Sequence, residues 1–241
     1  MNKIIGVIPA RYQSSRFEGK PLALICGKPM VWWVYQQAMK VSEIDEVYVA
    51  TDDERIAKCC RENGIQYMMT STSHRTGADR VAEVAEKTDG TIYLNIQGDE
   101  PLIDPEEIRE VIEILDDETV EYAALKTKIT TKEDWENPNI VKAVTDLKGD
   151  ALYLTRAGVP YNYEKGTAYR LVGLYSYRRQ FICDFGKWGQ SHLEIAENGI
   201  ECNRALEHGR NLRLRETTYG SIGVDLKEQI PLVEKMIQER Q

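Results

Sequence analysis

Short apolar segments alternate with helical patterns through the first half of the chain, and this alternation limits the possible fold more than any other feature. The pattern predicts strands at 4–8, 46–51 and 91–96, and helices at 29–39, 54–63, 77–87 and 105–115. Because parallel strands need long crossover connections, this order predicts a parallel sheet covered by helices. We therefore expect a doubly wound, mostly parallel α/β sheet whose ligand-binding loops lie at one strand edge.

The second half of the chain has a different pattern. Strands separated by short turns are predicted at 122–129, 141–145, 151–155 and 171–177, followed by a closing helix at 228–240. Residues 146–150 have the composition of a hairpin loop. We expect a β-hairpin-rich subregion at about 120–190 that serves as a lid or dimerisation surface. No linker or low-complexity segment divides the sequence, so one domain over residues 1–241 is predicted.

The composition excludes several classes of partner. A net charge of −8 is unfavourable for a protein that binds nucleic acid, because phosphate backbones attract basic surfaces. No apolar run has the length of a membrane span, and the first strand begins by Ile4, before a signal peptide would end. The five cysteines contain no C-x-x-C pair and no metal-ligand spacing. We therefore expect a reduced, cytoplasmic protein with no membrane and no nucleic-acid partner.

A basic loop follows the first predicted strand. It contains Arg11, Ser14, Arg16 and Lys20 together with the flexible Gly19. Guanidinium, ammonium and hydroxyl groups are the donors that phosphate oxygens need, so the loop predicts a polyphosphate site. The sequence has neither a G-x-x-x-x-G-K-[ST] nor a G-x-G-x-x-G fingerprint. An ordinary basic surface loop is the alternative.

A second polar cluster covers residues 70–80, which lead into a predicted helix. Its hydroxyls, with Arg75 and Arg80, lie where the partial positive charge of a helix N-terminus favours an anionic or polar ligand. His74 is expected to be the histidine nearest this site. A simple N-cap loop explains the cluster equally well.

Two carboxylates follow apolar runs that are far apart in the sequence. Asp99 comes after the strand predicted at 91–96, and Asp225 ends the short run 222–225. If both lie at strand ends, they converge on one Mg²⁺ that accompanies a phosphate. Helix caps or turn residues are the alternative for either aspartate.

The chain resembles the 3-deoxy-manno-octulosonate (Kdo) cytidylyltransferases. The resemblance is carried by IPARY at 8–12, SSR at 14–16, GKPL at 19–22, GKPM at 27–30, ATDD at 50–53, HRTGADR at 74–80, NIQGDEP at 95–101, NPNIVK at 137–142, YLTRA at 153–157, GLYSYR at 173–178, IE at 200–201 and GVD at 223–225. These motifs follow one another in the family's order over nearly the whole chain.

The resemblance implies a Rossmann-like nucleotidyltransferase of the nucleotide-diphospho-sugar transferase type, homodimeric and Mg²⁺-dependent. Its substrates would be CTP and a 3-deoxy sugar acid, joined as CMP-Kdo for lipopolysaccharide biosynthesis. By matching position, the nucleotide-binding residues would be Arg11, Ser14, Arg16, Lys20, Arg75, Thr76, Gly77 and Arg80. Arg11, Lys20 and Asp99 would be catalytic, and Asp99 and Asp225 would hold the metal. The sugar-acid residues would be Gln97, Arg156, Tyr175 and Glu201.

The chain departs from the family's pattern at four positions. Glu18 and Arg75 differ on the nucleotide side, and Leu171 and Tyr161 replace a histidine and a tryptophan on the sugar side. These changes leave two alternatives open. One is the same reaction on 8-amino-Kdo or another acidic sugar, and the other is a catalytically silent nucleotide-binding relative.

Overall fold

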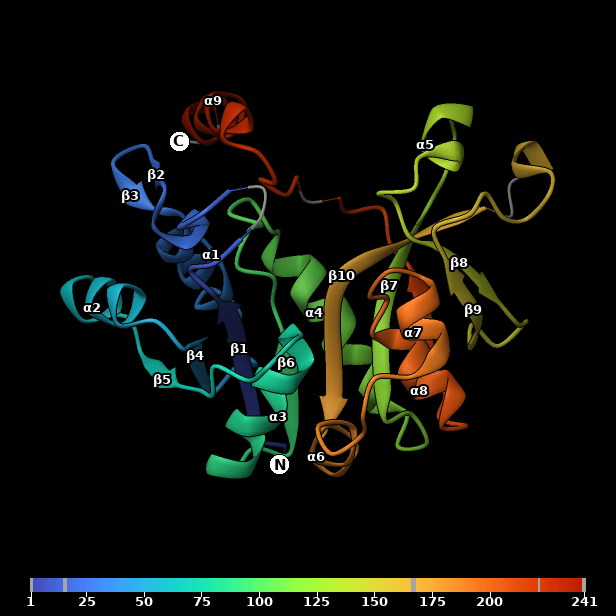
Figure 1. Cartoon of the computed structure of the whole chain (residues 1–241), viewed down its shortest axis with the longest axis horizontal. Coiled ribbons are helices and arrows are strands. Elements are labelled where there is room, and N and C mark those ends of the chain that lie inside the picture. Colours follow the sequence, from blue (N-terminus) through green and yellow to red (C-terminus); the bar gives the residue numbers. More distant parts are fainter. Residues whose placement is uncertain (1, 15–16, 166–167, 221, 240–241) are drawn as a thin grey trace. The chain divides into compact units, whose positions relative to one another are not determined.

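The structure is a computed structural model that describes residues 2–14, 17–165, 168–220 and 222–239. The described chain forms two compact units. The first unit consists of residues 2–109 and 222–239, and the second consists of residues 110–220. The first unit is therefore built from two segments that are far apart in the sequence. The prediction of a single domain stays a prediction, and the two units are described separately below (Figure 1).

A parallel sheet forms the centre of the first unit. Its strands are β1 (Ile4–Ala10), β4 (Glu46–Thr51), β5 (Tyr67–Met69) and β6 (Ile92–Asn95), in the spatial order β6-β1-β4-β5. All three pairs are parallel. Six of the seven residues of β1 are buried, which is typical of a central parallel strand with both faces covered.

Helices connect these strands. They are α1 (Met30–Ala38), α2 (Glu54–Glu62), α3 (Gly77–Lys87) and α4 (Pro105–Glu113), of which α4 contains the boundary between the units. Local sequence sets where they begin: the Asp53 side chain accepts from the Arg55 amide, and Thr76 and Asp79 form a capping box. A two-stranded ribbon, β2 (Leu24–Ile25) with β3 (Lys28–Pro29), precedes α1.

The strand order reverses direction at β1. The chain moves from β1 outward to β4 and β5 and then returns to β6 on the other side of β1. In a sheet of this kind the loops that follow the two strands at the reversal separate and leave a crevice for a ligand. The loops after β1 and β6 are the two that carry Arg11, Lys20 and Asp99. The α/β class predicted from the sequence is therefore confirmed, while the binding of a ligand at this edge stays a prediction.

The C-terminal segment returns to the first unit. Val224, with Val233 and Ile237 of α9 (Ile230–Glu239), packs in one cluster with Ile25 and Met30. The amide of Val224 also donates to the carbonyl of Asp99 at 2.8 Å. Residues 222–225 have no strand partner, so the expectation that Asp225 ends a strand is wrong. The segment is a loop that is fixed by this backbone bond and by the burial of Val224.

The second unit contains the hairpin-rich region. Its strands are β7 (Tyr122–Lys128), β8 (Lys142–Thr145), β9 (Ala151–Thr155), β10 (Tyr169–Arg178) and β11 (Arg213–Glu216). β7 lies between the parallel β11 and the antiparallel β10, and β8 pairs antiparallel with both β10 and β9. The amide of Asp146 donates to the carbonyl of Asp150, which confirms the predicted hairpin loop.

Aromatic side chains fill the core of the second unit. Tyr122 stacks on Tyr177 and on Phe181, with ring centroids 4.9 Å apart in both pairs. Among the described residues of this unit there are also four short α-helices, namely α5 (Lys132–Glu136), α6 (Arg179–Phe185), α7 (His192–Ala196) and α8 (Cys202–Glu207). The sequence analysis did not predict these four helices, and it also missed β5 and β11.

Candidate active site

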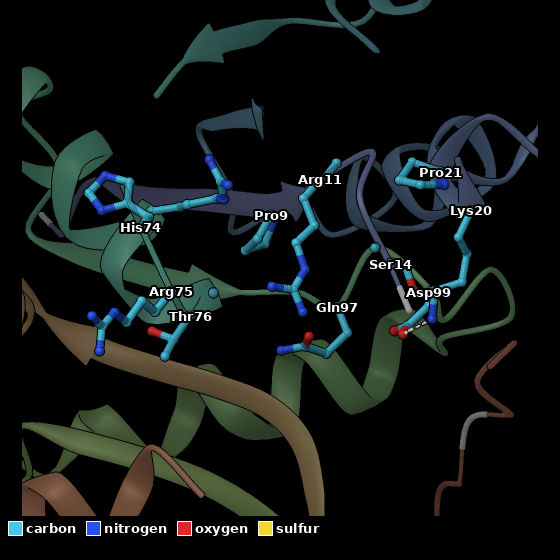
Figure 2. A pocket seen from close by; sticks show the side chains of 14 residues that line it. Pro9, Arg11, Ser14, Lys20, Pro21, His74, Arg75, Thr76, Gln97 and Asp99 are labelled. Atoms are coloured by element: carbon cyan, nitrogen blue, oxygen red, sulfur yellow. Dashed lines mark hydrogen bonds and ion pairs between the residues drawn. The ribbon is translucent and has the colours of Figure 1, made fainter. Parts of the chain in front are cut away.

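A pocket opens at the carboxyl edge of the parallel sheet, within the first unit (Figure 2). Its lining residues are Pro9, Ala10, Arg11, Ser14, Lys20, Pro21, His74, Arg75, Thr76, Gly77, Arg80, Gln97, Gly98 and Asp99. They come from the end of β1, from the start of α3 and from the loops that follow β1, β5 and β6. The structure therefore brings together most of the residues that the sequence analysis placed on the phosphate and nucleotide side. Arg16 lies outside the described residues.

One end of the pocket contains an ammonium group between two carboxylates. Lys20 Nζ lies 2.6 Å from Asp99 Oδ2 and 3.5 Å from Asp225 Oδ1. The two aspartates therefore approach one side chain, Asp225 from a loop, and their convergence on a metal ion stays a prediction. The Lys20 side chain is only 15% exposed, so its charge is held in a partly water-excluded position where it interacts strongly with a ligand.

The donor set at this end fits a magnesium ion. Mg²⁺ binds through one or two carboxylates and fills its remaining positions with water and substrate phosphates. Asp99 and Asp225 already share one cationic partner in Lys20, which shows that both carboxylates reach a common position. No group of three or more His, Cys, Asp or Glu side chains in the described part of the chain is arranged to hold a metal alone. Two carboxylates are within the number that Mg²⁺ takes from a protein when phosphate oxygens and water fill its other positions.

The loop after β1, called the first loop (residues 11–14 and 17–20), is held by its backbone and by one stacked pair. The Gly19 amide donates to the Tyr12 carbonyl at 2.8 Å, and Gly19 has a positive φ of 69°. The Arg55 guanidinium lies 3.2 Å from the centroid of the Tyr12 ring. Arg11 lines the pocket, is exposed, and forms no ion pair with a described residue. Its guanidinium is therefore available to an anionic ligand.

The loop before α3, called the second loop (residues 70–76), is held instead by charged side chains. Arg80 is 3% exposed, and its guanidinium donates to Thr70 Oγ1 at 2.7 Å and to Asp52 Oδ2 at 2.8 Å. Arg80 lines the pocket, as the sequence analysis proposed, but these bonds commit much of its donor capacity to holding the loop. The Thr76 hydroxyl caps α3, which accounts for its position in the motif.

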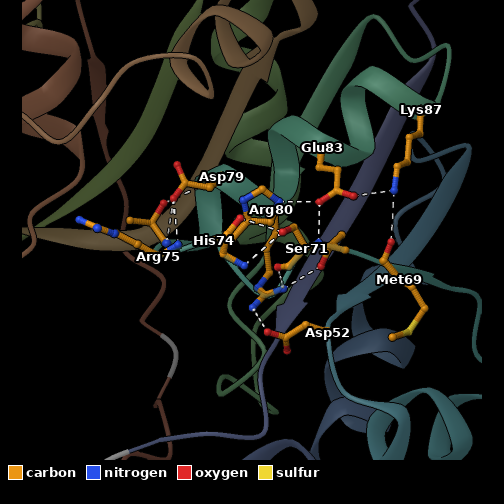
Figure 3. A network of polar contacts seen from close by, with 12 residues as sticks. Asp52, Met69, Ser71, His74, Arg75, Asp79, Arg80, Glu83 and Lys87 are labelled. Carbon is orange, nitrogen blue, oxygen red and sulfur yellow. Dashed lines mark hydrogen bonds and ion pairs between the residues drawn. The ribbon is translucent and has the colours of Figure 1, made fainter.

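The sequence analysis missed the partner of His74. Its Nε2 lies 2.5 Å from Oε2 of Glu83, a residue one and a half turns along α3 (Figure 3). The same carboxylate accepts from the Ser71 amide at 2.8 Å and from Lys87 Nζ at 2.5 Å. His74 lines the pocket and was expected near it, but nothing in the local sequence pattern points to Glu83.

The loop after β6 contributes a polar side chain and a close backbone approach. Gln97 lines the pocket, and its amide nitrogen donates to Asn95 Oδ1 at 3.3 Å. A Cβ added to Gly98 would lie 2.9 Å from the Pro9 carbonyl oxygen, so only glycine fits there without a shift. This close approach sets the distance between the loops after β1 and β6.

Three of the predicted sugar-acid residues lie in the second unit. The Arg156 guanidinium donates to the carbonyls of Glu197, Pro138 and Asn198, so it holds the backbone together. Tyr175 is 8% exposed, and burial raises its pKa well above the ordinary value, with the nearby Cys202 and Glu201 adding to the rise. Glu201 is partly exposed at the start of α8. Their assignment to sugar binding stays a prediction.

In the described part of the chain, the longest helices are too short or too polar to pass through a lipid bilayer.

A parallel sheet with a basic, carboxylate-bearing pocket at its reversal point defines the α/β nucleotide-binding class. The comparisons with known proteins agree with this class and narrow it.

A family model described as cytidylyltransferase matches residues 5–216. A 3-deoxy-manno-octulosonate cytidylyltransferase from Geotalea daltonii is 45% identical over 99% of this chain and 99% of its own. The enzyme of the same name from Geotalea uraniireducens is 48% identical over 92% and 94%. This chain belongs to the cytidylyltransferase family.

A solved structure of CMP:2-keto-3-deoxy-manno-octonic acid synthetase complexed with CTP has the same fold. It is 37% identical, covers 99% of this chain and 100% of its own, and superposes with a TM-score of 0.93. A 4-diphosphocytidyl-2C-methyl-D-erythritol synthase from Anaerococcus prevotii shares the fold alone, at 15% identity, coverage of 98% and 96%, and a TM-score of 0.65. Together these matches confirm the α/β nucleotidyltransferase fold.

Proposed function

We propose that this protein transfers CMP from CTP to the anomeric hydroxyl of Kdo and releases pyrophosphate. The observation that carries the proposal is the pocket at the sheet reversal, which Arg11, Lys20 and Asp99 line, with Asp225 3.5 Å from the Lys20 ammonium group. The relatives named above as 3-deoxy-manno-octulosonate cytidylyltransferases support the acceptor, and the CTP-bound solved structure supports the donor.

In this reaction the hydroxyl oxygen of the sugar forms a bond to the α-phosphorus of CTP. The bond from that phosphorus to the β-phosphate oxygen breaks, and the hydroxyl proton is released. The protein has little covalent work to do, because alignment and charge neutralisation supply most of the rate enhancement in phosphoryl transfer. Arg11 and Lys20 present fixed positive charge to the phosphates, and the Ser14 hydroxyl is placed on the same side of the pocket.

We also propose that the enzyme is Mg²⁺-dependent, with Asp99 and Asp225 as the protein ligands. When bound, the ion supplies positive charge to the triphosphate oxygens. Lys20 is positioned to exchange its contacts with the two carboxylates for contacts with phosphate oxygens. The homodimer and the cytoplasmic location stay predictions from the sequence.

The test is pyrophosphate release from CTP in the presence of Kdo, with UTP, ATP and GTP as competing donors. We expect turnover that requires Kdo, prefers CTP and ends when EDTA removes divalent cations. Equal use of purine triphosphates would contradict the cytidylyl assignment. Binding of CTP with no turnover on any sugar acid would instead favour the silent relative.

Leu171 is the residue that favours an alternative sugar-acid acceptor. It lies on β10 beside a register shift, where it offers apolar surface in place of the imidazole that the resemblance predicts. An acceptor with an altered chain end, such as 8-amino-Kdo, would then be used at least as well as Kdo. The measurement is kcat/KM for both sugars in the native protein and in Leu171→His. A tenfold preference for Kdo that Leu171→His leaves unchanged would rule this alternative out.

A further inference from the structure

The pocket has two chemically different ends. Lys20 and Asp99 lie at one end, His74 lies at the other, and Arg11 lies between them (Figure 2). A nucleoside triphosphate that places its phosphates against Lys20 and Arg11 directs its base away from them. The base therefore meets the end of the pocket that the second loop forms.

Glu83 holds this loop at two points with a single oxygen. Oε2 accepts from the Ser71 amide at 2.8 Å and lies 2.5 Å from His74 Nε2, while Oε1 lies 2.5 Å from Lys87 Nζ (Figure 3). Lys87 in turn donates to the Met69 carbonyl, at the end of β5. The carboxylate therefore connects α3 to both β5 and the second loop.

Glu83 stays ionised over the working range of pH. Burial opposes its charge, but the hydrogen bonds from Lys87, Ser71 and His74 outweigh that effect and lower its pKa to about 2. An ionised carboxylate only accepts hydrogen bonds. The Nε2 atom of His74 must therefore carry a hydrogen in order to bond to it.

This contact determines what the other ring nitrogen offers. In a neutral imidazole with hydrogen on Nε2, Nδ1 is an acceptor. None of the residues in the described ranges bonds to Nδ1 of His74. Cytosine has an exocyclic amino group, which donates, at the position where uracil has a carbonyl oxygen, which only accepts. When the ring is neutral, Nδ1 is therefore an acceptor on a residue that lines the base end of the pocket, and an acceptor there favours cytosine.

We propose that His74 is a specificity-determining residue for the cytosine amino group and that Glu83 is the positioning residue that fixes its tautomer. This inference rests on the proposed cytidylyl transfer. It assigns base selection to a side-chain pair that joins the second loop to α3.

The experiment measures the Kd of CTP and of UTP for the full chain by calorimetry, together with kcat/KM for both nucleotides. We expect His74→Ala and Glu83→Ala each to lower the CTP-over-UTP preference about tenfold, the scale of one hydrogen bond. Glu86→Gln is the matched control. Glu86 is an exposed carboxylate on the same helix, so this substitution removes one negative charge, as Glu83→Ala does. It should leave the preference unchanged.

The variant Glu83→Gln distinguishes the hydrogen bonds of Glu83 that position His74 from the negative charge of its carboxylate. Its amide oxygen can replace Oε2 and keep the contacts with Ser71 and His74, while Lys87 loses its anionic partner. We expect this variant to retain most of the CTP preference that Glu83→Ala loses. A preference lost equally in both variants would contradict the positioning role.

The tautomer itself is read from ¹⁵N spectra of the imidazole rings. The chain has three histidines, and His74→Ala identifies the signal of His74. The native protein should show the form protonated at Nε2, and Glu83→Ala should lose that bias. A native His74 that carries a hydrogen on Nδ1, alone or together with Nε2, or an unchanged CTP preference in His74→Ala, would overturn the inference. A protein that binds CTP selectively but does not act on Kdo would overturn the proposed function and leave this inference standing.

Discussion

The first loop and the second loop border the same pocket, but they are stabilised in opposite ways. The first is fixed by the backbone bond of Gly19 to Tyr12 and by stacking of Arg55 on the Tyr12 ring, which leaves Arg11 without an ion-pair partner among the described residues. The second is fixed by the Arg80–Asp52 pair and by Glu83. A cation that holds a loop has less capacity for a ligand. We infer that Arg11 serves the triphosphate and that Arg80 serves chiefly the fold.

The largest expected effect comes from removing the buried cation of the second loop. Arg80→Leu leaves Asp52 beside the cavity without its guanidinium partner, and breaking such a pair costs about 3–5 kcal/mol. Urea denaturation measures the loss. Arg55→Leu is the comparison, because the Arg55–Asp53 pair is exposed and is worth about 1 kcal/mol or less. Equal losses in the two variants would contradict the contrast between the loops.

Asp99→Asn should affect turnover and leave stability nearly unchanged. The aspartate contacts Lys20 and is proposed to hold the metal, so its charge acts on the reaction more than on packing. We expect kcat to fall on the order of 10²-fold or more, which is about 2.7 kcal/mol. Steady-state kinetics at saturating Mg²⁺ checks this. Activity close to that of the native protein would exclude Asp99 as a metal ligand.

Acid should weaken the second loop before the first. The pKa of Glu83 is lowered to about 2, so its contribution to stability is full above the unfolded value of about 4.3 and is lost as pH falls toward 2. The unfolding free energy of the native protein should exceed that of Glu83→Gln by up to about 3 kcal/mol at pH 6, which corresponds to the fall in pKa from about 4.3 to about 2. The difference should narrow between pH 5 and pH 3. A difference that stays constant over this range would show that the charge of Glu83 is not responsible.

The smallest expected effect concerns the backbone of the first loop. Gly19→Ala forces a side chain into positive φ and places its Cβ 3.1 Å from the Tyr12 ring, so we expect a loss of about 1–2 kcal/mol. Gly27→Ala is the matched control, because Gly27 also has positive φ but has nothing within 4 Å of the added Cβ. Only Gly19→Ala should also raise the KM for CTP. A similar KM in both variants would show that the Tyr12 contact does not shape the loop.

The elements with a clear local signal were predictable from the sequence. The strands at 46–51 and 151–155 and the helix at 77–87 match the structure residue for residue, because short, largely apolar runs mark the strands and a capping threonine marks the start of the helix. β11 was missed because its alternation is short: the buried apolar residues here are Leu212 and Leu214, and charged or polar residues surround them. β5 was missed because it has only three residues.

The parts of the site that could be predicted are those in which charged residues directly follow a predicted strand. Arg11, Lys20 and Asp99 follow strands that meet at one edge, and topology alone brings them together. The partners of Arg80 and His74 could not be predicted in this way. Asp52 lies 28 residues from Arg80, and Glu83 lies nine residues from His74 on a different element, so each contact depends on packing that no local pattern encodes.

The return of the C-terminal segment to the first unit has a kinetic consequence. Asp225 reaches Asp99 only after the chain has closed a loop of more than one hundred residues, and contacts of such high sequence separation form slowly. The lining of the pocket lies within residues 9–99 and needs no such closure. We therefore expect the refolding protein to acquire its nucleotide pocket first and its second carboxylate last, so that binding of CTP recovers earlier than catalysis.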